Sequence, residues 1–540
     1  MEPVVFVRKA SGLVRTMAPI DALFYNALVV GTILTFMWVT WYPVIAPGGD
    51  MILGYALSAV GAIPVLIVYS MLSSAMPRTG GDYIFQSRAI HPAFGFTMVG
   101  AGYIFFMFVW FVPPAWYLAS SCLTPLFGWL GQTYNNPGLT SIANWFTTVN
   151  GYALAGTLMN ILAFVVIIMG LRTYVRLQYL IMATNFIAWI LMIGLFAINS
   201  QSTFMASLNN YGLKFLGESN FTEKVISEAA KVGYYPKPAF SWHSTLAIMA
   251  LFWLLQMWSA FAVCQLGEIK EASDLKKNLF YTLGASWLNV FMVCTLLAVF
   301  FRTATEDFWV AQSKVTYEGT LVLTIAGQVF NIPSLSMILT SNPIIIGLIA
   351  LGFGLASFQI AYNAQLGGTR VTFATTFDRL LPSGLAHVSM RFHSPTMAAL
   401  MLAIGGELSI LIFNYFPAAW TYMLSVYFVA ILIPLFTTVA GILFPYRSAT
   451  KEIYRLSPIS KYKLGSLPAI SVIGILGLIF ELTCMYFYLT VPAFGIVSVP
   501  SLTIIMGVYI GFIIWYYAAR WYRSRQGIDI DLAYKTIPPV

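Results

Sequence analysis

Two acidic residues stand deep inside long apolar stretches of this sequence, Glu407 and Glu481, whereas no lysine or arginine does. An ionised side chain is costly in hydrocarbon, so an acid in such a place is a functional candidate by default. Glu407 follows Gly405 and Gly406, and two roles are open to it: carrying a proton, or making a structural hydrogen bond. Asp21 begins an apolar stretch, where capping a helix N-terminus is the simpler role.

Other recognisable chemistry is absent from the sequence. It contains no G-x-x-x-x-G-K-[ST] loop for nucleotide phosphates, no H-E-x-x-H and no G-x-S-x-G. The four cysteines include no Cys-x-x-Cys pair, and the four histidines lack ligand spacing, so we expect no metal site and no bound cofactor. A membrane-embedded enzyme would need clustered acid–base groups, which the apolar stretches lack. We therefore do not expect an enzyme.

The polypeptide backbone is the remaining source of polar groups. Where a helix is interrupted within a membrane, its free N–H and C=O groups can replace the hydration shell of a small molecule. Two stretches at corresponding places in the chain are weak points for a helix, and we expect them to bind the substrate: Val30, Gly31, Thr32 and Ile33, and Trp258, Ser259, Ala260 and Phe261. Trp253 and Trp258 have two open roles, gating or stacking on a cationic molecule, and ordinary packing.

The elements that position these residues are expected to be membrane-spanning helices. The chain has 59% hydrophobic and 9% charged residues, whereas soluble domains have about 25% charged residues. Apolar stretches long enough to cross a bilayer recur along it, which predicts an all-α integral membrane protein with about twelve spans. The predicted spans are residues 21–45, 50–76, 93–130, 151–171, 174–199, 243–267, 278–301, 341–366, 395–416, 418–444, 465–490 and 498–521. The third is overlong and contains Pro113-Pro114, which predicts a kink or a short surface helix at its end.

The basic residues are segregated between alternate loops. With the N-terminus placed inside, 22 of the 28 Lys and Arg residues fall on the cytoplasmic side and 6 fall outside, as the positive-inside rule requires. This predicts a multi-pass protein of the cell membrane with both termini in the cytoplasm and the lipid bilayer as its surroundings. The net charge of +9 is explained by the same loops, so we expect no nucleic-acid partner.

Three loop motifs resemble a known family. The stretch 75–83 reads Ala-Met-Pro-Arg-Thr-Gly-Gly-Asp-Tyr, Gly267-Glu268-Ile269-Lys270 follows the sixth span, and Phe377-Asp378-Arg379-Leu380-Leu381-Pro382 precedes the ninth. In this order they are similar to the loops of permeases of the amino acid–polyamine–organocation (APC) superfamily. The glycines of the first motif allow a tight turn. The resemblance covers residues 10–445.

The resemblance implies a leucine-transporter-type core, a 5+5 inverted repeat followed by two peripheral C-terminal helices. The expected parts are the tail 1–20, the ten-helix core 21–444 with repeats 21–199 and 243–444 and the outer loop 200–242, the cytoplasmic loop 445–464, helices eleven and twelve in 465–521, and the tail 522–540. A short polar helix is expected in the outer loop 200–242, and 302–340 forms a second long outer loop.

The resemblance also implies secondary transport of an amino acid by alternating access, coupled to an ion (H+ or Na+) or by exchange. Amino acid members usually carry Gly-[ST]-Gly in span one, whereas Gly31-Thr32-Ile33 lacks the second glycine. The alternative is therefore a polyamine or another organic amine; a transporter-like nutrient sensor is a further reading. Glu407 and Ser357 are the ion-coupling candidates, Ser357 because sodium-coupled relatives use hydroxyls of span eight.

Overall fold

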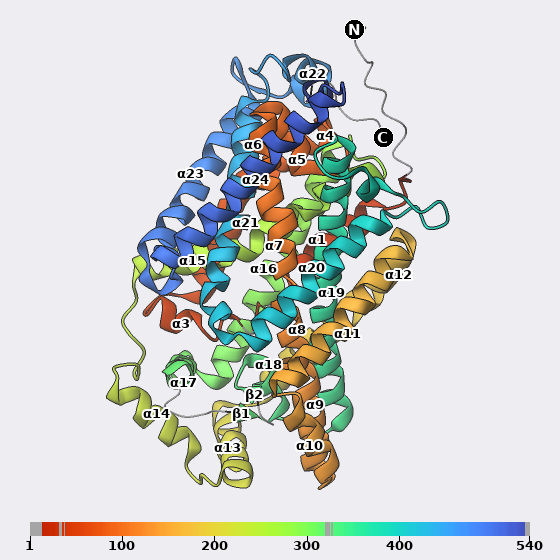
Figure 1. Cartoon of the computed structure of the whole chain (residues 1–540). Helices are drawn as coiled ribbons and strands as arrows, with labels where there is room; N and C mark the ends of the chain where they lie inside the picture. Colours follow the sequence, from red (N-terminus) through yellow and green to blue (C-terminus); the bar gives the residue numbers. More distant parts are fainter. Residues whose placement is uncertain (1–12, 32–34, 37, 319–323, 326–327, 535–540) are drawn as a thin grey trace.

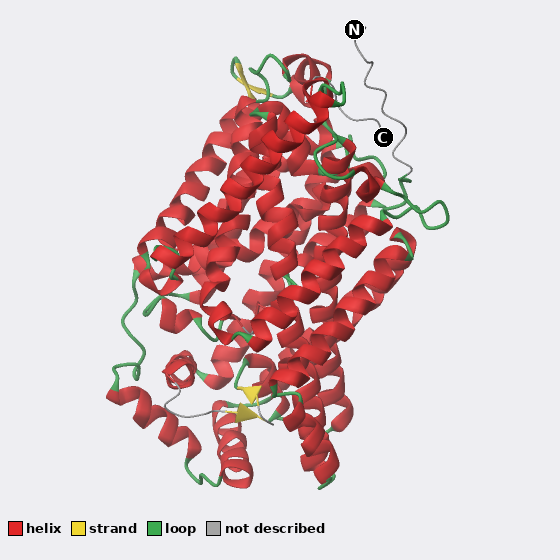
Figure 2. Ribbon diagram, viewed as in Figure 1, coloured by secondary structure: helices red, strands yellow, loops and turns green. Residues whose placement is uncertain are grey.

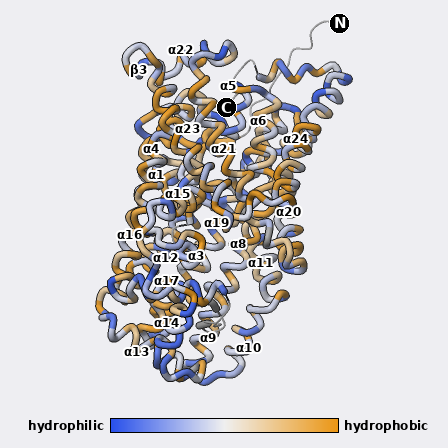
Figure 3. The backbone as a smooth tube through the Cα atoms, turned by 90° about the vertical axis from the view of Figure 1, so that its left-hand side faces the viewer, coloured by the Kyte–Doolittle hydropathy of each residue, from blue (hydrophilic) through white to orange (hydrophobic). Residues whose placement is uncertain are grey.

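The computed structural model describes residues 13–31, 35–36, 38–318, 324–325 and 328–534, and most of these residues are helical (Figures 1 and 2). Eleven helical segments of the described chain are long and apolar enough to span a membrane. Hydrophobic segments fill the helical middle, and hydrophilic ones gather at both ends (Figure 3). The prediction of an all-α integral membrane protein is confirmed.

The first half of the chain contributes four of these segments and one shorter apolar helix. The shorter helix, α1 (Pro19–Val30), ends well before the predicted limit of span one. The long ones in this half are α4 (Met51–Ala75), the composite segment Pro92–Thr133, α11 (Val149–Ile168) and α12 (Leu171–Ile198). Two short helices, α3 (Tyr42–Ile45) and α5 (Gly81–Ala89), flank α4.

The composite third segment is continuous but irregular. Two π-helical turns interrupt it, and such turns occur mostly as single bulges within α-helices, often at functional sites. Its parts are α6 (Pro92–Val99), η1 (Gly100–Phe105), α7 (Phe106–Val109), α8 (Val112–Tyr117), η2 (Leu118–Leu123) and α9 (Thr124–Thr133). The chain turns at Trp110 and Phe111, just before Pro113-Pro114, and the separate helix α10 (Pro137–Trp145) follows the span.

The second half contributes the other seven segments. The first of them changes geometry along its length, from α15 (Trp242–Gln256) to the 3-10 helix η4 (Met257–Glu268). The others are α16 (Leu275–Ala304), α19 (Pro343–Phe377), α20 (Thr396–Tyr415), η6 with α21 (Pro417–Tyr422 and Met423–Leu443), α23 (Ala469–Thr490) and α24 (Val499–Arg525). Because α19 runs to Phe377, Gly367–Phe377 is helical beyond the predicted limit of the eighth span.

Short elements close the two ends of the bundle (Figure 1). One end, called here the α13 end, carries two helices in the 200–242 loop instead of the one predicted. Its elements are α13 (Gln201–Tyr211), η3 (Gly212–Leu216), α14 (Phe221–Lys231), α17 (Glu306–Glu318), the antiparallel pair β1 (Thr324–Ile325) and β2 (Gln328–Val329), and α18 (Ile332–Met337).

The opposite end, called here the α5 end, carries α5 and the loop that leads to the last two spans. Its further elements are η5 (Ser383–Ala386), α22 (Lys451–Leu456), η7 (Pro458–Lys461), the antiparallel pair β3 (Lys463–Leu464) and β4 (Leu467–Pro468), and η9 (Ile530–Tyr534). The short η8 (Pro492–Phe494) joins α23 to α24.

The packing of the first ten spans has a paired pattern. The first packs against the sixth (α1 and η4), the second against the seventh (α4 and α16), and the fourth against the ninth (α11 and α20). The fifth packs against the eighth (α12 and α19), and the third against the tenth (η1 and α21). These pairs are compatible with a repeat of five spans, because exchanging the halves maps each pair onto itself or onto another pair.

The last two spans lie beside this ten-span bundle. Helix α23 packs against α4, α15 and α21, and α24 packs against α6 and α21. Only 17% of the apolar window of α24 is buried inside the protein, the smallest share among the eleven segments. The greater part of α24 therefore faces the surroundings of the bundle.

Candidate functional site

Two helix interruptions meet inside the bundle. Helix α1 ends at Val30, and Gly31 adopts the left-handed conformation (φ 67°, ψ 50°), with its N–H donating to the carbonyl of Leu28 at 3.2 Å. Glycine adopts this conformation without a steric cost. The partner span changes from α-helix to 3-10 helix at Met257. Since α1 and η4 pack together, both changes in backbone geometry belong to one region.

Asn26 joins the two interrupted segments. Its side-chain oxygen accepts a hydrogen bond from the Ala262 amide of η4 at 2.7 Å, and its Nδ2 donates to the carbonyl of Tyr281 on α16 at 3.1 Å. Asn26 is fully buried. An amide of the 3-10 segment is thus satisfied by α1, because the altered helix does not satisfy it internally.

An aromatic cluster fills the space beside the interruptions. The Phe261 ring is stacked between Tyr25 of α1 (5.7 Å, 9°) and Tyr103 of η1 (5.7 Å, 15°). Trp258 stacks on Phe106 (5.6 Å, 8°) and meets Phe261 edge to face at 5.2 Å. Rings in such arrays present flat apolar faces and, to cations, favourable quadrupoles.

A small cavity borders this cluster. It is lined by Tyr69 of α4, Tyr103 of η1, residues of η4 that include Trp258, Ala260 and Phe261, and residues of α21 such as Pro434. Its volume of about 10 Å3 holds roughly one water molecule. Four spans therefore converge here with their side chains closed around the space.

A buried polar network lies on the other side of Tyr25. Gln265 donates to the Tyr25 hydroxyl at 3.0 Å, which donates to the carbonyl of Asn363 at 3.3 Å. Gln359 Nε2 donates to Asn363 Oδ1 at 2.6 Å and to the hydroxyl of Tyr174 at 3.1 Å, and that hydroxyl also bonds Asn363. Spans one, five, six and eight thus share one hydrogen-bonded network.

Several polar atoms of this region have no protein partner in the part of the chain that the structure describes. They are the Trp258 Nε1, Gln265 Oε1, Gln359 Oε1 and Asn363 Nδ2 atoms. Buried polar groups in proteins are nearly always paired, with protein or with water. These atoms are therefore available to hydrogen-bond a polar ligand or water.

The structure brings together three of the nine predicted binding residues at the cavity, Trp258, Ala260 and Phe261. Val30 and Gly31 are buried at the end of α1, and Ala260 lines the cavity with Trp258 and Phe261. Ser259 does not line the cavity. Its hydroxyl donates to Gln256 Oε1 at 3.2 Å, and the same oxygen accepts a hydrogen bond from Ser286 of α16. Thr32 and Ile33 lie outside the described residues.

Trp253 is separate from this group. Its ring packs edge to face against Phe480 of the peripheral helix α23, with centroids 5.1 Å apart, and it does not line the cavity. The two tryptophans singled out in the sequence therefore lie in different surroundings.

The two ion-coupling candidates also occupy different places. The Ser357 hydroxyl donates to the carbonyl of Phe353 within α19 at 2.9 Å. Glu407 accepts hydrogen bonds from Thr157 (2.6 Å) and Asn160 (3.0 Å) and so connects α20 to α11. These bonds fit the structural role considered above, and both roles of Glu407 stay predictions.

A buried carboxyl that the sequence marked only as part of a loop motif adjoins the cavity. Asp82 accepts hydrogen bonds from Tyr103 and from Thr437 of α21, both at 2.6 Å, and is fully buried. Burial raises the pKa of Asp82, although the hydrogen bonds from Thr437 and Tyr103 act to lower it. In the sequence, Asp82 is marked only by the glycine pair that precedes it. The fold shows that its hydrogen-bond partners lie on the third and tenth spans.

Ion pairs and backbone bonds connect the segments of the α5 end. Arg370 binds Glu268 through two hydrogen bonds of 2.8 and 2.9 Å, and Arg88 binds Asp378 at 2.9 Å; all four side chains are buried. Met17 adds a short parallel bridge, since its N–H donates to the carbonyl of Glu268 at 3.0 Å. These contacts therefore seal the α5 end of the bundle.

Comparison with known proteins agrees with this architecture. The family model described as amino acid permease matches residues 21–514 of the 540-residue chain. No curated protein matches the chain. The matched region contains every candidate span of the described residues in full except α24, of which it contains the greater part. It also contains most of the short helix α1 and all three loop motifs. The chain belongs to the amino acid permease family of the APC superfamily, and it is a membrane transporter rather than an enzyme.

Proposed function

We propose that the protein moves an amino acid across the cell membrane by alternating access, as a secondary transporter. The observation that carries the proposal is the meeting of two interrupted helices, at Gly31 and at Met257, next to a closed cavity. The backbone where α1 ends, at Val30 and Gly31, offers polar groups for a charged end of an amino acid, and Trp258 and Phe261 offer apolar faces for its side chain.

In the proposed orientation the α5 end faces the cytoplasm. The loops at this end carry Arg78, Arg88, Lys270 and Arg447, and the uneven distribution of basic residues, 22 against 6, favours this orientation. The ten-span core from 21 to 444 then works as two repeats of five, as the paired packing of the spans supports. The sealed α5 end corresponds to a state closed toward the cytoplasm.

An organic amine is the second candidate for the substrate. The aromatic cluster around Trp258 and Phe261 supports it, because tryptophan faces attract cations. An amine lacks the carboxylate of an amino acid. Competition between the two classes of compound therefore distinguishes these candidates.

Uptake into proteoliposomes tests the proposal. Vesicles containing the full chain should accumulate or exchange at least one labelled amino acid, and protein-free vesicles should not. Imposed H+ and Na+ gradients, applied separately, identify the coupling ion, and exchange alone requires neither. Absence of uptake and exchange across a panel of all amino acids would overturn the proposal, and uptake of polyamines alone would favour the amine.

A further inference from the structure

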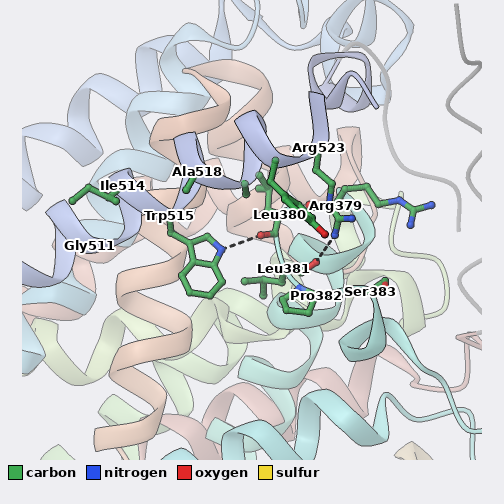
Figure 4. A pocket seen from close by; sticks show the side chains of 12 residues that line it. Arg379, Leu380, Leu381, Pro382, Ser383, Gly511, Ile514, Trp515, Ala518 and Arg523 are labelled. Carbon is green, nitrogen blue, oxygen red and sulfur yellow. Dashed lines mark hydrogen bonds between the residues drawn. The ribbon is translucent and has the colours of Figure 1, made fainter. Parts of the chain in front are cut away.

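A pocket on the outer surface of the bundle is unrelated to the central cavity. It has a volume of about 630 Å3 and lies between the segment Arg379–Ser383, just after α19, and one face of α24. Figure 4 shows Gly511 and Ile514 at one end of this pocket, and Arg379 and Arg523 together at the other. The pocket therefore has an apolar end and a basic end.

The apolar end follows a single face of α24. Gly511, Ile514 and Ala518 are spaced three and four residues apart, which places them on one side of a helix. A side chain at Gly511 would meet no atom within 4 Å, so the surface is open there. From Gly511 to Arg523 the helix rises about 18 Å, close to half the thickness of the hydrocarbon core.

Hydrogen bonds fix the basic end of the pocket. Arg523 donates to the carbonyls of Arg379 at 3.1 Å and Leu381 at 3.5 Å, which fixes the loop against the helix. Trp515 in the middle of the pocket donates from its Nε1 to the carbonyl of Leu380 at 3.0 Å (Figure 4). These bonds hold the walls of the pocket in place.

The charge at this end is positive. No acid lines the pocket among the described residues. The nearby acids have cationic partners already, since Asp378 pairs with Arg88 and Asp531 pairs with Arg520. Arg379 and Arg523 thus both lie at this end of the pocket, and no carboxylate lines it among the described residues. An anion with an apolar tail complements both ends.

We propose that this pocket binds one anionic phospholipid, with its phosphate at Arg379 and Arg523 and an acyl chain along Gly511, Ile514 and Ala518. Helix α24 is the most exposed of the long apolar helices. In a bilayer, its outer face is therefore in contact with lipid. The three nitrogens of the Arg523 guanidinium already donate to the carbonyls of Arg379 and Leu381 and to Gln526 Oε1, so Arg523 attracts the phosphate through its charge. Basic pockets between spans bind anionic headgroups in this way. The site goes beyond the proposed transport function and depends only on the chain lying in a bilayer.

Native mass spectrometry of the detergent-purified full chain tests the proposal with two probes, a phosphatidylglycerol and a phosphatidylcholine with the same acyl chains. We expect one phosphatidylglycerol molecule to bind in preference. Arg379→Gln should weaken its binding by about fivefold, and Gly511→Leu should weaken the binding of both lipids by filling the groove.

Two control variants on the same helix separate the site from general effects. Arg525→Gln removes an equal charge from an arginine that stacks on Trp521 at 3.9 Å and does not line the pocket. Gly507→Leu adds the same side chain at another open glycine of α24 that does not line it. Both should bind phosphatidylglycerol as the wild type does. A thermal unfolding curve for each variant confirms that it is folded.

Three results would overturn the proposal. The first is that the wild type binds the two lipids equally. The second is that Arg525→Gln weakens the binding of phosphatidylglycerol as much as Arg379→Gln does. The third is that folded Gly511→Leu binds both lipids as the wild type does. A dimer that Gly511→Leu abolishes and phosphatidylglycerol does not displace would assign the pocket to a second copy instead. Because lipid adducts are measured, failure here leaves the transport proposal intact, and failure of transport leaves this site intact.

Discussion

Buried charged groups gather at the α5 end, and each is held by partners from a distant part of the sequence. Glu268 of η4 pairs with Arg370 of α19, and Asp378 pairs with Arg88 of α5. Asp82 is held by hydroxyl groups and has no cationic partner among its hydrogen bonds. The three acids, Asp82, Glu268 and Asp378, belong to the three loop motifs that carried the family resemblance, so the sequence located them. Their pairing depends on how the spans pack, which the sequence alone does not specify.

Arg370→Gln should destabilise the protein strongly, because it leaves the Glu268 carboxylate buried without its partner. Breaking a buried pair costs about 3–5 kcal/mol. The exposed pair of Arg455 with Glu452 (3.5 Å) is the control, and Arg455→Gln should cost at most about 1 kcal/mol. Unfolding of the purified variants in detergent measures both. Equal effects of the two substitutions would contradict the structural importance of the buried pair.

Asp82→Asn should change how stability depends on pH. Burial raises the pKa of Asp82, so the folded protein keeps this proton at a pH where the unfolded chain has lost it. The resulting stabilisation is present below the ordinary pKa of an aspartate and is lost as pH rises through the raised value. Asparagine has no such proton, so the variant should lose less stability than the wild type as pH rises.

Thermal unfolding between about pH 4 and pH 8 tests this sign. The exposed Glu223→Gln on α14 serves as the control and should keep the wild-type dependence. A wild type that gains stability relative to Asp82→Asn with rising pH would show that the hydrogen bonds from Tyr103 and Thr437 outweigh the cost of burial.

At the scale of the elements, the interruption of the first span could be predicted and that of the sixth could be predicted only in part. Glycine readily adopts the left-handed conformation that ends a helix, and α1 does end at Gly31. The sixth span has no glycine or proline at Met257, and its 3-10 geometry depends on contacts such as Asn26 with Ala262. One polar helix was expected in the loop 200–242, and α14 occupies that place, whereas α13 and α17 were not predicted.

Gly31→Ala should destabilise the protein, because an alanine in the left-handed region costs about 1–2 kcal/mol. Gly194 gives a matched control within a regular helix, where an added Cβ meets no atom within 4 Å. Gly194→Ala should be neutral or stabilising by up to about 1 kcal/mol. Thermal unfolding of the two variants should thus give shifts of opposite sign or very different size, and equal shifts would contradict the left-handed conformation.

Gly367→Ala should disturb the aromatic cluster. A Cβ at this position of α19 would overlap the Phe261 ring, which is already held between Tyr25 and Tyr103, and overpacking costs about 1–3 kcal/mol. Gly347→Ala on the same helix meets open space and should leave uptake unchanged. Uptake and unfolding should both be impaired in the first variant, and unimpaired uptake would separate the cluster from function.

At the scale of the whole molecule, the sequence predicted the architecture well because bilayer physics restricts the choices. Apolar length and the low charge content indicate spanning helices, and the structure contains eleven of them and the short α1. The family match extends from 21 to 514, beyond the motifs that suggested it. The predicted end of the eighth span at residue 366 was wrong, because α19 runs to Phe377 and apolar length does not show where a helix continues beyond its apolar part.

The separation of Trp258 from Trp253 allows the most direct test of the central claim. Both are buried tryptophans of one segment, but only Trp258 lines the cavity beside the interrupted sixth span, and Trp253 packs against Phe480. The measurement is the initial rate of amino acid uptake against concentration in proteoliposomes. Trp258→Phe should raise KM by about tenfold, the equivalent of 1.4 kcal/mol, and Trp253→Phe should leave KM unchanged. An unchanged KM in Trp258→Phe, or an equal rise in both variants, would contradict the claim that the substrate binds at this site.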